Sequence, residues 1–200
     1  MYFTKTLFIS CCLALAALTA NAQNDDVEKD MDIIEKRIEG KPTKAAHKIA
    51  IGYNLTDVQN SFGVGLNVTS PYFFHKSMAV RLRANMQFLQ HIPTATPNAT
   101  IWSPYGMLQL GLVGGDGVVK KNMRFYGEGG VVVIMPNDEF SANSTVGGYG
   151  LFGFEFFLAK PIAFHIEMGG MGTGGTAEKS VGKPIYANGF LTNVGVRLLL

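Results

Sequence analysis

The segment from Tyr149 to Gly170 alternates between large apolar residues and residues that are small or charged. The large apolar positions are Phe152, Phe154, Phe156, Leu158, Ile162, Phe164, Ile166 and Met168. Successive side chains of a strand point to opposite faces, so this spacing predicts two strands joined by a turn at Ala159-Lys160-Pro161. One face of this hairpin is bulky and apolar, and the other mixes glycine with charge. That combination is typical of a transmembrane β-barrel.

The same alternation recurs along the chain and predicts eight strands. Besides the hairpin, which supplies the sixth and seventh strands, we expect strands over approximately residues 47–55, 62–69, 78–89, 102–113, 123–134 and 189–200. Each is close to the ~9–11 residues that a tilted transmembrane strand needs. The predicted fold is therefore all-β, an eight-stranded antiparallel up-and-down transmembrane β-barrel over residues 46–200.

The predicted connections alternate in length. The shorter set is 70–77, 114–122 and 159–161, whereas 90–101, 135–145 and 170–188 are longer and richer in Ser, Thr, Asn, Gly and Pro. The first connection, residues 56–61, is short and departs from this pattern. Outer-membrane barrels have short periplasmic turns and longer extracellular loops. With an even number of strands, both termini are expected in the periplasm.

Residues 1–22 have the pattern of a secretory signal peptide. Lys5 supplies the positive start, Leu7–Thr19 is the apolar core, and Ala20-Asn21-Ala22 predicts cleavage before Gln23. The alternative, a membrane anchor, is disfavoured because the apolar run is shorter than the roughly 20 residues that span a bilayer. Both cysteines lie inside this segment, so the mature chain is expected to have no disulfide, thiolate metal site or cysteine nucleophile.

Residues 23–45 differ from the rest of the chain in being densely charged. Val27, Met31, Ile34 and Ile38 recur at helical spacing, which predicts a short amphipathic helix followed by a linker. The segment has two interpretations: a periplasmic contact or lumen plug, or a solvated and partly disordered leader. We favour the leader, since a lone helix this short is marginal in water.

Charge and side-chain size distinguish a membrane barrel from a secreted, lipocalin-like barrel with its apolar face turned inward. Charged residues make up only 16% of the chain, against about 25% in ordinary soluble domains. The polar face is largely glycine, and the phenylalanine face would overfill a small interior. Both observations favour a lipid-facing apolar surface. The net charge of +2 gives no sign of a nucleic-acid partner.

The chain resembles the small outer-membrane β-barrel proteins of Gram-negative bacteria, of the outer membrane protein beta-barrel domain kind. The resemblance rests on the signal peptide followed by Gln23, on Phe125–Gly130 (FYGEGG), on the Gly153–Gly170 hairpin and on the closing strand Val194–Leu200. It implies a monomer in the cell outer membrane, with membrane lipid and the barrel-assembly machinery as partners. Such barrels usually end on an aromatic residue, whereas this sequence ends on leucine.

The predicted inward face carries charges of both signs. The candidate lumen residues are Lys48, Arg81, Arg83, Arg124, Arg197, Glu128, Glu155 and Glu167, with His165 nearby. Eight strands enclose a space that side chains can nearly fill, and unpaired charges in a dry interior cost several kcal/mol. We therefore expect an ion-pair network that closes the lumen. The alternative is a narrow polar pore or a small-ligand pocket.

Catalysis is the third possibility, because some outer-membrane barrels of this size are lipid A-modifying enzymes. These need a histidine together with a serine or acidic residue at the outer rim. His91 lies in one predicted loop, and Ser141 and Ser144 lie in another near Asp138 and Glu139. No motif fixes their geometry, so we interpret them as polar loop residues and expect no enzymatic activity.

Metal and cofactor sites are not expected. The histidines His47, His75, His91 and His165 lack ligand spacing. Gly169–Gly175 is glycine-rich but lacks the lysine and flanking helix of a phosphate loop, so we interpret it as a loop. The leading hypothesis is a non-enzymatic outer-membrane barrel that acts through its extracellular loops or as a structural component of the membrane.

Overall fold

The structure is a computed structural model that describes residues 48–59, 61–74, 77–115, 118–120, 123–159 and 161–200. The chain divides into two compact units, Met1–Lys41 and Pro42–Leu200, and all described residues belong to the second. The predicted signal peptide, the predicted helix and linker of residues 23–45, and His47 and His75 lie outside the described residues. None of the described residues forms a helix that is long and apolar enough to cross a membrane.

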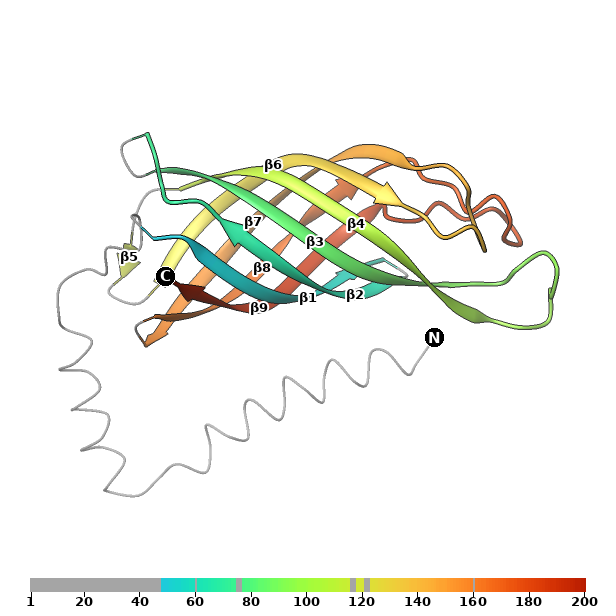
Figure 1. Cartoon of the computed structure of the whole chain (residues 1–200), viewed down its shortest axis with the longest axis horizontal. Coiled ribbons are helices and arrows are strands. Elements are labelled where there is room, and N and C mark those ends of the chain that lie inside the picture. Colours follow the sequence, from blue (N-terminus) through green and yellow to red (C-terminus); the bar gives the residue numbers. More distant parts are fainter. Residues whose placement is uncertain (1–47, 60, 75–76, 116–117, 121–122, 160) are drawn as a thin grey trace, which may run out of the picture. The chain divides into compact units, whose positions relative to one another are not determined.

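Eight long antiparallel strands form a closed barrel (Figure 1). The strands are β1 (Ala50–Val58), β2 (Ser61–Thr69), β3 (Met78–His91), β4 (Ile101–Gly114), β6 (Met123–Met135), β7 (Thr145–Ala159), β8 (Ile162–Gly172) and β9 (Gly189–Leu199). Neighbours in sequence pair with one another, and β1 pairs with β9 to close the sheet. The short β5 (Val118–Lys120) pairs with β6, which also pairs with β4. The predicted all-β, eight-stranded antiparallel barrel is confirmed.

The first hairpin is longer than the sequence pattern indicated. The pattern ended the first strand at Leu55 and left residues 56–61 as a connection. In the structure β1 continues to Val58, which is paired with Ser61. Thr56 points inward and is buried, so its hydroxyl continues the polar inner face of the strand instead of ending it.

The two faces of the barrel follow the alternation in the sequence. Outward side chains are large and apolar, as at Leu66 (61% exposed) and Phe190 (63%). In the middle of the barrel the inward side chains are mainly polar, charged or small, and Arg81 and Glu167 are at most 1% exposed. The inner face therefore holds the ionisable residues that are candidates for function.

The two ends of the barrel differ. The long connections 92–100, 136–144 and 173–188 lie together at one end, here called the loop end, and the C-terminus and β5 lie at the other, here called the terminal end (Figure 1). A buried apolar cluster occupies the interior toward the loop end. It includes Val58, Leu89, Tyr105, Met107, Ile134, Phe140, Tyr186 and Leu191. This cluster separates the polar middle of the barrel from the loops.

Candidate functional site

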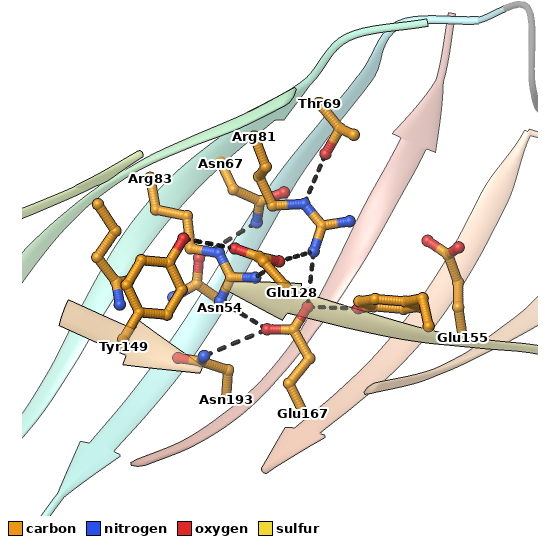
Figure 2. A network of polar contacts seen from close by, with 12 residues as sticks. Asn54, Asn67, Thr69, Arg81, Arg83, Glu128, Tyr149, Glu155, Glu167 and Asn193 are labelled. Carbon is orange, nitrogen blue, oxygen red and sulfur yellow. Dashed lines mark hydrogen bonds and ion pairs between the residues drawn. The ribbon is translucent and has the colours of Figure 1, made fainter. Parts of the chain in front are cut away.

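Two arginines of β3 lie between two glutamates from other strands in the middle of the lumen (Figure 2). Arg81 Nη1 donates to Glu128 Oε2 at 2.5 Å and to Glu167 Oε1 at 3.0 Å. Arg83 Nη2 donates to Glu128 Oε2 at 2.6 Å, and its Nη1 lies 2.6 Å from Glu167 Oε2. All four side chains are at most 1% exposed. The ion pairs join β3 to β6 and β8 through the interior of the barrel.

A third arginine extends this cluster toward the terminal end. Arg197 of β9 donates from Nη2 to Glu167 Oε1 at 2.5 Å and from Nη1 to Glu155 Oε1 at 3.2 Å. Its Nε donates to Asn67 Oδ1 at 3.2 Å. Strands β3, β6, β7, β8 and β9 all therefore contribute charges to one network, whose members are Arg81, Arg83, Arg197, Glu128, Glu155 and Glu167. We call this set the lumen network.

Two tyrosines complete the coordination of the glutamates. Tyr126 donates to Glu167, and Tyr149 donates to Glu128 Oε1 at 2.8 Å. Each ring lies over an inward glycine. A Cβ on Gly153 would lie 2.6 Å from the Tyr126 ring, and a Cβ on Gly111 would lie 2.2 Å from the Tyr149 hydroxyl oxygen. These glycines leave the space that the phenols need.

Neutral polar side chains continue the network toward the loop end. Asn54 donates to Thr56 at 2.8 Å and to Asn85 at 2.9 Å, and Thr56 donates to Asn193 Oδ1 at 2.7 Å. Asn193 in turn donates to Glu167 Oε2 at 3.2 Å. The candidate residues chosen from the sequence omitted these amides and both tyrosines. Their position at every second residue of a strand was the signal that could have identified them.

The structure does not place all the predicted lumen residues in the network. Lys48 is exposed at the terminal end and donates to the Leu199 carbonyl at 3.4 Å. Arg124 Nη1 lies 4.0 Å from Glu155 Oε2. His165 is fully buried, but neither ring nitrogen has a hydrogen-bond partner in the described part of the chain. These three residues surround the network rather than joining it.

A second polar cluster lies at the loop end, around His91. Ser180 Oγ and His91 Nδ1 lie 2.9 Å apart, and His91 Nε2 and Ser103 Oγ also lie 2.9 Å apart. Ser103 donates to the Glu139 carboxylate. Because Ser103 uses its proton there, its oxygen accepts from His91 Nε2–H, and Nδ1 then accepts from Ser180. The hydrogen bonds run in one direction from Ser180 to Glu139.

Ser180, His91 and Ser103 are hydrogen-bonded in the same order as the nucleophile, base and orienting group of a catalytic triad. The surroundings of Ser180, however, do not fit acyl transfer. Ser180 is 1% exposed. The backbone amides of Ser180 and Val181 already donate to the carbonyls of Ala177 and Ile92, so neither is available to an oxyanion. The sequence pattern placed His91 in one predicted loop, and Ser141 and Ser144 in another near Asp138 and Glu139. No hydrogen bond joins any of them to His91 among the described residues, whereas Ser103 and Ser180, which the sequence analysis did not select, do contact it.

No metal site is evident in the described residues, where no three His, Asp, Glu or Cys side chains are grouped to hold an ion. His91 is the last residue of β3, at the loop end, whereas His165 lies on β8, paired with Glu155 of β7.

Comparison with solved structures identifies the architecture. The outer membrane protein OprG from Pseudomonas aeruginosa superposes with a TM-score of 0.54 and 15% sequence identity, over 78% of this chain and 98% of OprG. The chain has the fold of an outer-membrane β-barrel. The N-terminal β-barrel domain of OprF from the same organism matches with a TM-score of 0.48 and 9% identity, over 77% of this chain and 98% of that domain. No family model and no curated protein sequence matches the chain.

Proposed function

We propose that this protein is a closed, non-enzymatic integral outer-membrane β-barrel that carries a packed set of extracellular loops. The observation that supports this most directly is the lumen network. Arg81 and Arg83 each bridge Glu128 and Glu167, so strands on different sides of the lumen are joined by ion pairs at 2.5–3.0 Å. An eight-stranded barrel leaves an interior that side chains nearly fill, and here charged side chains fill it.

The outward face supports insertion in a membrane. Apolar side chains from every long strand are exposed, including Leu55, Leu66, Leu82, Leu110, Val131, Phe152, Ile162 and Val196. An exposed apolar surface of this extent is unusual in a soluble monomer, whereas lipid requires it. The likeness of the fold to that of OprG supports the same placement.

The loops support a role at the surface that does not depend on transport. Aromatic rings of Tyr105, Phe140 and Tyr186 pack edge to face, with centroids 5.0–6.1 Å apart. The hydrogen bonds around His91 tie residues 173–188 to β3 and β4. These contacts hold the loops in one arrangement, which suits a surface that presents a fixed shape to the exterior, with both termini in the periplasm.

Membrane fractionation and conductance measurements test the proposal. The full-length protein should fractionate with outer membranes and migrate differently on gels before and after heating. Purified barrel should be silent in planar bilayers, because the lumen network blocks the path of ions. Recovery of the protein in the soluble periplasmic fraction would refute the membrane placement. Steady conductance by the unmodified protein would instead support the narrow-pore alternative.

A further inference from the structure

The buried charges of the barrel do not balance. Apart from histidine, the buried residues of the described chain that carry a charge at neutral pH are four arginines (Arg81, Arg83, Arg124 and Arg197) and three glutamates (Glu128, Glu155 and Glu167). Even with both histidines neutral, the interior carries one excess positive charge. Lys48 at the terminal end adds a second, partly solvated one. A buried charge without a counter-charge destabilises the fold. The position of the excess positive charge therefore indicates where a counter-charge could bind.

The excess is located at Arg124 of β6. This residue is only 7% exposed. Its Nε and Nη2 atoms are buried and have no hydrogen-bond partner among the described residues. Among the described residues, Glu155 is the one carboxylate that forms an ion pair with it, with Oε2 4.0 Å from Nη1. That carboxylate already accepts a hydrogen bond from Arg197 at 3.2 Å. Arg124 is therefore a buried cation with free donors and a shared, distant partner.

A small cavity lies beside Arg124. It is lined by Lys48, Thr69, Tyr72, Arg81, Arg124, Glu155 and Arg197 together with Ala50 and Leu199. The Tyr72 ring stacks on the Arg124 guanidinium at 3.9 Å from its centroid. Burial raises the pKa of the Tyr72 hydroxyl, so this ring stays a neutral phenol that can donate a hydrogen bond. Four of the lining side chains are cationic and one is anionic, so the cavity favours negative charge.

We propose that this cavity binds a monovalent anion of about the size of a water molecule, held by Arg124 with Lys48 and Tyr72 at its edge. The cavity has a volume of about 10 Å³, which is about the space that one water molecule needs. Chloride and bromide are single atoms only somewhat larger than water, whereas sulfate and phosphate are far larger. The bound anion balances the excess arginine at the terminal end of the barrel. This inference goes beyond the proposed function and does not depend on it.

The first experiment measures the thermal stability of the full-length protein in detergent at constant ionic strength, with chloride replaced by gluconate or sulfate. An anion at about ten times its Kd should raise the Tm by roughly 3–6 °C for a protein of this size. Chloride and bromide should produce this rise relative to gluconate. Sulfate is the control for general salt effects, because it stabilises folded proteins by exclusion from their surface. Equal Tm values in chloride, bromide and gluconate would overturn the proposal.

Two substitutions at the cavity should act in opposite directions. Arg124→Gln removes the excess charge and should abolish the difference between chloride and gluconate. Glu155→Gln removes the competing carboxylate and should tighten halide binding several-fold, an outcome that a purely structural role of Glu155 does not predict. Lys183→Gln, at an exposed lysine of the loop end, is the matched control and should keep the response of the unmodified protein. A halide response that persists in Arg124→Gln would refute the assignment of the site.

Bromide soaking keeps the proposal testable if a variant fails to fold. Crystals of the unmodified protein soaked in bromide should show an anomalous peak within hydrogen-bond distance of Arg124 Nε or Nη2. A peak of ordinary density without anomalous signal at that place would identify a water molecule and overturn the proposal. A peak only on exposed lysines would overturn it as well.

Discussion

Glu167 is the residue on which most of the lumen network converges. Its carboxylate lies within 2.5–3.0 Å of Arg81, Arg83 and Arg197 and accepts further hydrogen bonds from Tyr126 and Asn193. A buried charge with this many donors is stabilised by every one of them. Loss of the charge leaves three arginines of the interior short of a partner.

Glu167→Gln should therefore destabilise the barrel strongly, by about 3–5 kcal/mol, because it leaves buried arginines uncompensated. The measurement is unfolding by urea in lipid vesicles, with the folded fraction determined from the change in gel mobility on heating. Glu178→Gln, at an exposed loop residue, should leave the stability within about 0.5 kcal/mol of the unmodified protein. Equal effects of the two substitutions would contradict the role of the network in stability.

Gly153 offers a second test at the scale of single residues. A methyl group there would meet the Tyr126 ring at 2.6 Å, and this ring holds Glu167. Gly153→Ala should cost about 1–3 kcal/mol through overpacking of the lumen. Gly150 of the same strand faces outward, and its nearest neighbour would be 4.0 Å from the new methyl group. Gly150→Ala is therefore the matched control, with no steric cost expected in the same unfolding measurement.

At the scale of elements, the hydrogen bonds of His91 join three parts of the loop end. Ser180 belongs to the connection between β8 and β9, Ser103 to β4 and Glu139 to the connection between β6 and β7. The backbone amide of Val181 also donates to the Ile92 carbonyl at 2.8 Å. His91 thus fixes the longest connection to the barrel wall.

Ser180→Ala should loosen that connection locally while leaving the barrel intact. Loss of one hydrogen bond of about 1 kcal/mol should speed hydrogen exchange at the Val181 amide roughly fivefold. Ser144→Ala, at an exposed serine, should leave exchange unchanged.

Lipid A profiles should be the same with and without His91→Ala. A lipid profile that changes on expression and reverts in His91→Ala would show that the Ser180–His91 pair is catalytic.

The strands were largely predictable from the sequence, and the contacts between distant segments were not. Alternation identified the inward positions of Arg81, Glu128 and Glu167, since facing depends only on local spacing. The contact of His91 with Ser180 depends on how the long connection 173–188 packs against the barrel, which no local pattern encodes. The contact with Ser103 depends on the register of β3 and β4, in which Ser103 is paired with Leu89. The weak contact between Arg124 and Glu155 was also not predictable from local spacing. The register of β6 and β7 pairs these two residues, but the Glu155 carboxylate accepts a hydrogen bond from Arg197 instead.

At the scale of the whole molecule, the outward face distinguishes a membrane barrel from a soluble one. Leu66 lies on the outer face of β2 and is 61% exposed. An arginine there should cost about 2–4 kcal/mol at the bilayer midplane. The same change on a water-facing surface would be close to neutral.

Leu66→Arg should consequently reduce the fraction of protein that folds into vesicles, measured by the shift in gel mobility. Val146→Arg is the control, because Val146 is similarly exposed (67%) but lies at the loop-end start of β7. A charge near the interface should cost only about 0–1 kcal/mol. Equal insertion of both variants would argue that the apolar belt does not face lipid.

The pairing of β1 with β9 also determines when the barrel can close relative to the synthesis of the chain. Ala50 is paired with Leu199, so the two strands that seal the cylinder are almost the whole described chain apart. Until β9 has been synthesised, β1 has an open edge whose amides and carbonyls can pair with any other strand. The cylinder can therefore close only after translation of its final strand.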